Sequence, residues 1–229
     1  MSATLKSATQ KQHDEAEGHR LHAVMFGSQG VPAARESFAR TLGQHVPIQE
    51  AFVPRLLAAA ERAPWGEVVK PYHTHLEALR EDCEPMGVTT EMCRPMAGAR
   101  RFIERIGQLS EGEAWGLLGV FYVFEGSTNG GTIIAMRVRE LMGLETDAGT
   151  RFINPHGREV RPRWMKWRED VDALEIGEAE RAAVIAGAGG VHTLGRSAER
   201  RGRRDEHADR RQARGGGAAD QGGGEAVTR

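Results

Sequence analysis

The sequence has only two cysteines, Cys83 and Cys93, and they form neither a CxxC pair nor a metal-type cluster. This argues against a disulfide scaffold and indicates a reducing compartment. No apolar run approaches the roughly 20 residues that a membrane helix needs. Residues 1–20 are polar and lack the apolar core of a signal peptide. We therefore expect a cytoplasmic protein with no membrane segment.

An excess of charge of either sign is also missing. The chain has 31 basic and 32 acidic residues, a formal net charge of −1. A general nucleic-acid binder needs a basic field, so this class of function is disfavoured. Hydrophobic residues make up 39% of the 229 positions, which is lean but sufficient for a buried core. We expect one domain of ordinary size.

Large apolar residues are scarce at the C-terminal end. Residues 186–229 hold 11 of the 29 glycines and 9 arginines, with no aromatic residue. Such a segment buries too little apolar surface to offset the entropy of ordering. We predict a domain at 1–185 and a disordered Arg/Gly-rich tail at 186–229. A frame-shifted end of a GC-rich gene is one alternative, and RNA binding by the tail is another.

The body of the chain is predicted to be mostly helical. Apolar residues recur with helical spacing, and prolines and caps mark the ends. The expected helices cover residues 4–25, 33–42, 48–62, 67–84, 91–109 and 163–176, and a further helix begins at 177. A break is expected near Pro47. Ser110 with Glu113 predicts a capping box that starts the helix after residue 113.

Residues 119–136 do not fit this helical pattern. They read GVFYVFEGSTNGGTIIAM, rich in β-formers around the pair Asn129–Gly130. Local rules favour a β-hairpin. Each glycine in a helix would cost about 1 kcal/mol relative to alanine.

His13 is the first candidate for chemistry. Lys6 lies two turns before it on the same helical face, and Glu17 lies one turn after it. A histidine that binds a porphyrin iron needs an acceptor for its second nitrogen, which Glu17 could supply. Lys6 is placed to meet a heme propionate. The alternative is a surface helix with ordinary charges.

The glycine-rich segment is the second candidate. If it is helical, Gly126 and Gly130 share one face, with Ser127 and Gly131 beside them. A flat ligand could then approach the backbone, with room for an oxygen molecule above it. The alternative is the hairpin turn.

Together these segments resemble the heme oxygenase family. LKSATQKQHDEAE at 5–17 resembles its opening helix, and YVFEGSTNGG at 122–131 resembles the glycine-rich distal helix of its bacterial members. The likeness extends to INPHGREVRPRWMKWREDVDALE at 153–175, where Arg168 takes the place of a basic residue that meets the propionates. The resemblance implies an all-α, multi-helical bundle with heme between two helices, and it overrides the hairpin.

The resemblance also implies a reaction and roles for single residues. Heme, as substrate and cofactor, would be opened with O₂ and electrons from an external reductase or ferredoxin, giving biliverdin, CO and Fe²⁺. His13 would bind the iron and Glu17 would orient it, while Lys6 and Arg168 would meet the propionates. The oxygen side would be formed by Gly126, Ser127, Gly130 and Gly131. Whether the biliverdin serves iron supply or a photoreceptor stays open.

The sequence departs from the family in two places. Animal-type members carry an aspartate where this chain has Ser127, so water held by Ser127 and the backbone would have to deliver protons. The family's last helix runs past residue 185, where this sequence turns into the tail.

Two rival functions remain. One is a protein on the same fold that binds heme, or another flat ligand, without turnover. The other is a thiaminase- or di-iron-type relative, for which the sequence shows no clear ligand set. Glu15, His19 and His22 could bind a metal, but a solvated face is favoured. His73 and His75 are two residues apart and cannot share a helix face. The four tryptophans are expected in the core or in pocket walls.

Overall fold

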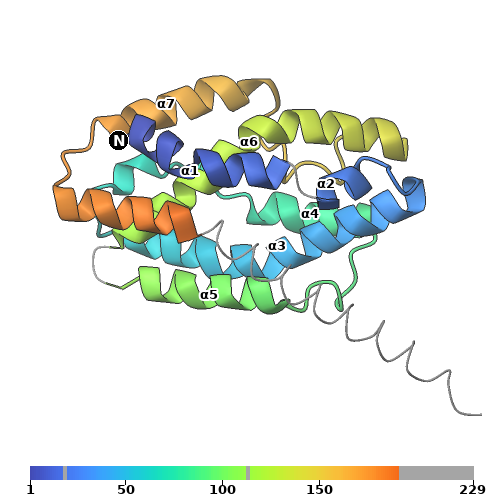
Figure 1. The fold of residues 1–229 in the computed structure, drawn as a ribbon, viewed down its shortest axis with the longest axis horizontal. Helices are drawn as coiled ribbons and strands as arrows, with labels where there is room; N and C mark the ends of the chain where they lie inside the picture. The colour runs from blue at the N-terminus through green and yellow to red at the C-terminus, as the bar shows by residue number, and fades with distance from the viewer. Residues whose placement is uncertain (18–19, 112–113, 191–229) are drawn as a thin grey trace, which may run out of the picture.

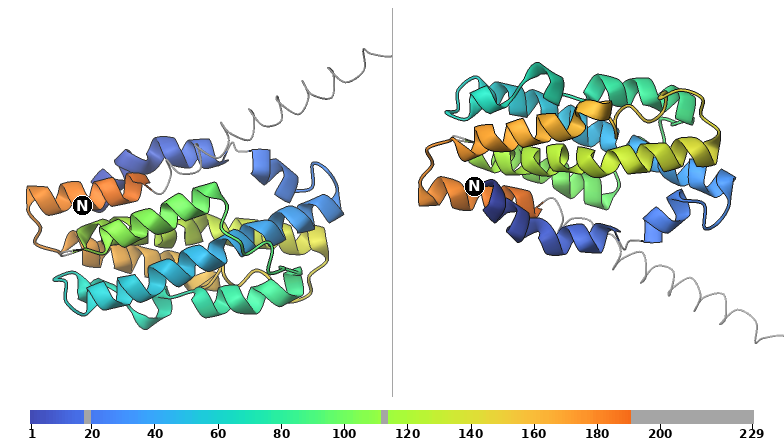
Figure 2. Two further views of the ribbon diagram at one scale, coloured as in Figure 1. Left: turned by 90° about the horizontal axis from the view of Figure 1, so that it is seen from below. Right: turned by 90° about the horizontal axis from the view of Figure 1, so that it is seen from above.

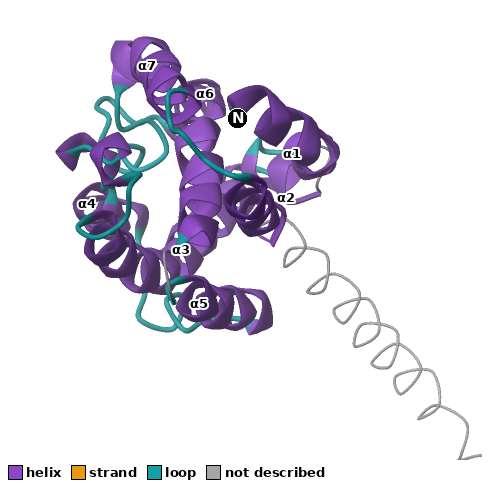
Figure 3. Cartoon of the chain, turned by 90° about the vertical axis from the view of Figure 1, so that its left-hand side faces the viewer, coloured by secondary structure: helices purple, strands orange, loops and turns teal. Residues whose placement is uncertain are grey.

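The chain forms a bundle of helices, shown in Figure 1. The computed structural model describes residues 1–17, 20–111 and 114–190, and for 11–17 and 20–22 it describes the backbone alone. These residues contain helices, turns and loops but no β-strand (Figure 3). None of the described helices is long and apolar enough to cross a membrane. The predicted all-α class is confirmed.

The helices follow one another along the chain, with the longest loops between α4 and α5 and between α6 and η3. They are α1 (Ser2–Glu17), α2 (Arg20–Met25), α3 (Val31–Ala60), η1 (Gly66–Val68), η2 (Pro71–His73), α4 (Leu76–Met86), α5 (Ala97–Leu109), α6 (Trp115–Met142), η3 (Gly157–Glu159) and α7 (Val160–Asp172). A last helix covers residues 178–190. Of the single helix predicted over 4–25, the structure describes the parts that belong to α1 and α2, while residues 18–19 between them lie outside the described residues.

The long helix α3 lies at the centre and contacts α2, α4, α5 and α6. It runs through Pro47 without ending, and it also contains Pro54. The predicted break near Pro47 is therefore wrong. A proline inside a helix removes one backbone hydrogen bond. Here that loss is offset by packing, since large apolar side chains along α3 are buried on either side of Pro47: Phe38, Leu42, Phe52 and Leu56.

The glycine-rich segment is helical from end to end, as part of α6. The hairpin expected from local rules is wrong, and the helix implied by the family resemblance is right. The physical reason is burial, because the first half of α6 lies in the core with Leu117, Leu118, Val120 and Phe121 almost fully covered. Such burial outweighs the helix propensity lost at the glycines.

At Pro71 and at Ser110 the structure differs from the prediction. Residues 67–84 were expected to form one helix, but Pro71 starts the separate short helix η2, and α4 begins only at Leu76. Ser110 does not cap the next helix. It ends α5, and its hydroxyl donates to the carbonyl oxygen of Gly107 at 2.6 Å. The start of α6 has no side-chain cap. Of the predicted capping box, Glu113 lies outside the described residues.

The helix at 178–190 belongs to the packed body. Val184 and Ala188 are fully buried, and a Cβ atom on Gly187 would lie 2.0 Å from the carbonyl oxygen of Gly116. The predicted boundary after residue 185 therefore falls inside a helix and is wrong for residues 186–190. These residues are small, and small residues permit close helix contact without large apolar side chains. The rest of the predicted tail, 191–229, lies outside the described residues.

Helices α1, α6 and α7 lie together on one side of the bundle, with α4 and α5 on the other (Figures 2 and 3). Contacts at the start of the chain join α1 to the end of α7. The N-terminal amine forms an ion pair with Asp172 at 2.8 Å, and the Ser2 hydroxyl donates to the same carboxylate at 2.6 Å. Burial raises the pKa of Asp172, but its bonds to the amine and to Ser2 outweigh this effect and lower the pKa to about 2.

Candidate active site

A pocket of about 490 Å³ lies between α1, α6 and α7. Its described lining residues are Lys6, Thr9, Gln10, Tyr122, Val123, Gly126, Ser127, Asn129, Trp164 and Arg168. Four of the predicted site residues, Lys6, Gly126, Ser127 and Arg168, are thus brought together from three helices. A volume of several hundred Å³ is typical of pockets for organic ligands.

Two positively charged side chains line the pocket, and they come from different helices. Lys6 lies on α1 and Arg168 on α7. The guanidinium of Arg168 donates to the Ser2 hydroxyl at 3.1 Å, and Ser2 is in turn bonded to Asp172. This chain of bonds restrains Arg168 on the pocket wall. A ligand with acidic groups would find two positive charges here, one of them held in place.

The α6 wall of the pocket carries small residues. A Cβ atom on Gly126 would lie 3.3 Å from the ring of Trp164, so the lack of a side chain here lets Trp164 of α7 pack closely against α6. The hydroxyl of Ser127 donates to the carbonyl oxygen of Phe124 at 2.7 Å. Its proton is therefore engaged within the helix, and Ser127 can offer a pocket molecule only its oxygen lone pairs.

Gly130 and Gly131 differ in what surrounds them. A Cβ atom on Gly130 would meet no atom within 4 Å. On Gly131 it would lie 1.6 Å from the carbonyl oxygen of Ile153, so Gly131 permits a close backbone contact between α6 and the loop before η3. Neither glycine is among the residues that line the pocket. Gly130 lies one turn after Gly126 on the same side of α6.

Aromatic rings form a further part of the wall. Trp164 stacks on Trp167 with 5.4 Å between ring centroids, and Tyr122 packs against both. Burial raises the pKa of the Tyr122 hydroxyl. The prediction that the tryptophans belong to the core or to pocket walls is confirmed, since Trp65, Trp115 and Trp167 are buried and Trp164 lines the pocket.

The side chains of His13 and Glu17 lie outside the described residues, as do those of His19 and His22. Their backbone is described in part: His13 and Glu17 belong to α1. Lys6, Thr9 and Gln10 of the same helix line the pocket. His13 follows Lys6 by seven residues, which is two turns along one helical face.

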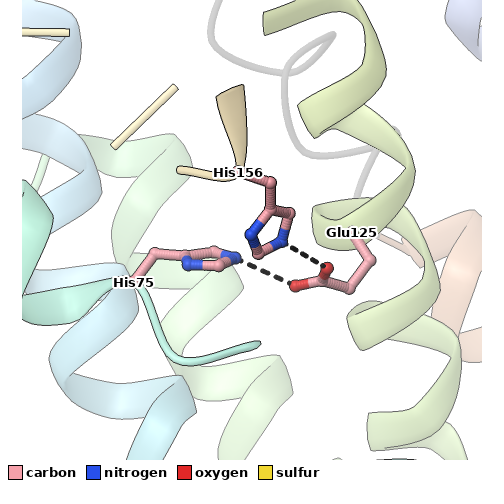
Figure 4. Close-up of side chains that lie close together, drawn as sticks. All are labelled: His75, Glu125 and His156. Atoms are coloured by element: carbon pink, nitrogen blue, oxygen red, sulfur yellow. Dashed lines mark hydrogen bonds and ion pairs between the residues drawn. The ribbon is translucent and has the colours of Figure 1, made fainter. Parts of the chain in front are cut away.

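Sequence reasoning missed a second cluster, which begins one residue before Gly126. Glu125 is buried and faces three histidines. Its carboxylate oxygens lie 3.1 Å from Nε2 of His75, 3.6 Å from Nε2 of His156 and 3.9 Å from Nε2 of His73. Figure 4 shows Glu125, His75 and His156 pointing toward one another.

Burial sets the charges in this cluster. It lowers the pKa of His73 to about 4, so this imidazole is neutral at pH 7. Burial also raises the pKa of Glu125, but its interactions with His156 and His75 outweigh that and hold the pKa below its usual value. Glu125 is therefore an ionised carboxylate inside the protein. The only sequence signal for it was a charged residue in the middle of an apolar helix.

Comparisons with known proteins agree with the observed fold. The family model described as heme oxygenase matches residues 1–196. No curated protein is similar enough in sequence to count as a relative. Solved structures with the same fold include the heme oxygenase of Leptospira interrogans. It is 21% identical with a TM-score of 0.74, and the match covers 84% of this chain and 95% of that one.

Two heme oxygenases of the cyanobacterium Synechocystis also match. Heme oxygenase-1, solved in complex with heme, is 16% identical with a TM-score of 0.73, over 84% of this chain and 87% of that one. Heme oxygenase-2, solved with heme and NO, is 18% identical with a TM-score of 0.74, over 86% of this chain and 82% of that one. At such identities the structural matches support the fold, and the family model covers most of the chain. The chain belongs to the heme oxygenase family.

Proposed function

We propose that this protein binds heme between α1, α6 and α7 and opens it to biliverdin, CO and Fe²⁺ with O₂ and external electrons. The observation that carries the proposal is the pocket that joins Lys6 and Arg168 to the small residues of α6, Gly126 and Ser127. The electron donor is a separate protein, a reductase or a ferredoxin.

The described residues fit a heme. A porphyrin is flat and apolar and carries two carboxylates at one edge. Tyr122, Val123 and Trp164 supply apolar and aromatic wall, while Lys6 and Arg168 supply the positive charges that two propionates need. One turn after Gly126, the open space at Gly130 would let the ring approach the α6 backbone.

His13 is proposed as the iron ligand. Support comes from the periodicity of α1, because Lys6 and Gln10 line the pocket and the next residues on that face are His13 and Glu17. Glu17 would accept a hydrogen bond from the second imidazole nitrogen and so orient the ring. Lys6 would reach one propionate from the same helix.

When bound, heme supplies the redox chemistry and is itself the substrate. The protein's task is to position the ring and to supply protons. No carboxylate is found among the described residues of the pocket wall. We propose that a water molecule near Gly126 and Gly130 carries the protons. Because the Ser127 proton is bonded to Phe124, Ser127 would accept a hydrogen bond from this water.

The lack of a carboxylate in the described wall also favours a second candidate, a protein that holds heme without opening it. Its pocket would need the same apolar surfaces and cations. The two functions differ in proton supply, because only turnover consumes protons.

Both candidate functions are tested by titrating the purified protein with hemin and then adding a reductase and NADPH under air. Heme oxygenase activity predicts a histidine-ligated heme spectrum that decays to that of biliverdin, with CO released. Stable binding without decay would favour the holding protein. In His13→Ala the histidine-ligated spectrum should be lost, and an unchanged spectrum would remove His13 as the ligand.

A further inference from the structure

Three segments that lie far apart in the sequence meet at Glu125. His75 precedes the first turn of α4, Glu125 lies in α6, and His156 precedes η3. All three are buried or nearly so, with exposed side-chain fractions of 11%, 5% and 2%. The pocket lining between α1, α6 and α7 includes none of them. The proposed heme chemistry gives them no role.

The nitrogen and oxygen atoms of this cluster lie close enough together to bind one metal ion. One nitrogen of each histidine and one oxygen of Glu125 all lie within 4.8 Å of one another. Nε2 of His75 lies 3.1 Å from Oε1 of Glu125, and Nε2 of His156 lies 3.6 Å from its other oxygen, Oε2. Around a tetrahedral ion with bonds of about 2.0–2.1 Å, neighbouring ligand atoms are about 3.4 Å apart. An ion could therefore sit between these atoms with only small shifts of the side chains.

One of these nitrogens is not satisfied by hydrogen bonding. Nε2 of His156 is buried and has no hydrogen-bond partner among the described residues, because 3.6 Å to Glu125 is too long for one. Buried polar atoms are rarely left in this state, and a place for a bound ion is one of the recognised explanations. This nitrogen faces Glu125 (Figure 4).

From this geometry we infer that His75, Glu125 and His156 bind a divalent transition-metal ion. Two imidazoles and one carboxylate suit Zn²⁺, Fe²⁺ or Co²⁺, whereas Mg²⁺ and Ca²⁺ prefer oxygen ligands. The set holds one carboxylate and fits a single ion. It lacks the several bridging carboxylates of the di-iron bundles. The ion would join α4, α6 and the loop before η3.

His73 is placed to support the site rather than to bind the ion. Its Nδ1 accepts a hydrogen bond from the backbone N–H of Lys70 at 2.9 Å. The neutral ring therefore carries its proton on Nε2, the nitrogen that faces Glu125 at 3.9 Å. At 3.9 Å this N–H makes no hydrogen bond to Glu125 as it stands. A small shift on metal binding would let it donate to the carboxylate and orient it, as outer groups do in known metal sites.

Arg163 competes with the ion. Its Nη1 lies 3.2 Å from Nδ1 of His156. A guanidinium can only donate, so in this arrangement the neutral His156 ring carries its proton on Nε2. To bind an ion through Nε2, His156 must move that proton to Nδ1, and Arg163 must turn away. Arg163 stacks on the partly exposed ring of Tyr72 at 4.4 Å, so its charge has a path to solvent. Removing Arg163 should therefore strengthen metal binding.

The test is titration of the metal-free, heme-free full-length protein with Co²⁺, read by its visible absorption bands, and with Zn²⁺, read by calorimetry. We expect one ion per chain and bands typical of nitrogen and oxygen ligands. His75→Gln and Glu125→Gln should each lower the affinity at least tenfold, and Arg163→Met should raise it about tenfold. The double variant His19→Gln/His22→Gln is the matched control, because it removes two histidines from elsewhere and should leave the affinity unchanged.

Circular dichroism shows whether each variant is folded. If Glu125→Gln does not fold, His75→Gln and Arg163→Met still decide, because they predict opposite changes. The inference is overturned if the wild type gives no Co²⁺ bands at millimolar Co²⁺, or if the ion is lost in the His19/His22 variant and kept in His75→Gln. It is also overturned if Arg163→Met binds the ion more weakly than the wild type.

Discussion

A Cβ atom on Gly119 would lie 2.0 Å from the carbonyl oxygen of Val184, so α6 and the last described helix touch backbone to backbone. Gly119→Ala should therefore force the two helices apart and lower the free energy of unfolding by about 1–3 kcal/mol. Gly107→Ala is the matched control. It lies in α5 with no atom within 4 Å of the new methyl group, and it should raise stability by about 0.5–1 kcal/mol. Urea unfolding measures both, and equal effects would contradict the close contact.

The same contact predicts how the protein responds to shortening. A chain that ends at Gly190 keeps the whole helix 178–190, whereas one that ends at Ile185 loses the buried Ala188 and the close contact of Gly187 with Gly116. The chain ending at Ile185 should melt several degrees lower, at about 2–4 °C for each kcal/mol lost. Equal melting temperatures for the two chains would show that residues 186–190 do not contribute to the core.

Stability should fall in mild acid because of His45. Burial lowers its pKa from 6.5 to about 4. The unfolded chain binds a proton at this position below about pH 6.5, but the folded chain does so only near pH 4. The stability that neutral His45 contributes is therefore full above pH 6.5 and is lost as the pH falls toward 4. Between pH 7 and pH 5 the loss is about 2 kcal/mol.

Replacing His45 tests this source of acid sensitivity. His45→Leu should lose about 2 kcal/mol less than the wild type between pH 7 and pH 5, measured by denaturant unfolding at both values. If the variant and the wild type lose stability in parallel, His45 does not remain neutral in the folded protein.

The two pocket cations should contribute to heme affinity. Lys6→Gln and Arg168→Gln are each expected to weaken hemin binding about tenfold and to reduce its dependence on salt, because each removes a charged partner of a propionate. Arg55→Gln removes an exposed charge on α3, outside the pocket, and should have no effect. Titration followed in the Soret region gives the affinities. Binding that is the same in all four proteins would place the propionates elsewhere.

Features that depend on residues close together in the sequence could be predicted from it, whereas features that depend on contacts between distant segments could not. The periodicity of α1 and the spacing of Lys6 on it are local, and the sequence places Lys6, Gly126, Ser127 and Arg168 in what proves to be one pocket. The helix over the glycine-rich segment could not be derived locally, because it depends on burial of α6 by other helices. Only the family resemblance pointed to it.

The Glu125 cluster, by contrast, is a site that the sequence alone did not predict. His73 and His75 cannot share a helix face, but His73 ends η2 and His75 precedes α4, so both reach Glu125. His156 comes from a loop about 80 residues later, with no pattern in the sequence to connect it. A cluster built from irregular segments leaves no periodic signal, and only the tertiary structure reveals it.

The most direct measurement is the rate of biliverdin formation from hemin by the wild type and by Gly130→Leu, with a reductase, NADPH and air. Space around Gly130 is open, so the fold should tolerate leucine there. The wild type should form biliverdin. The variant should still bind hemin with the spectrum of histidine ligation. It should form biliverdin at least roughly tenfold more slowly than the wild type, because leucine displaces the water and crowds the ring. Wild-type turnover in Gly130→Leu, or no biliverdin from the wild type, would contradict the proposed function.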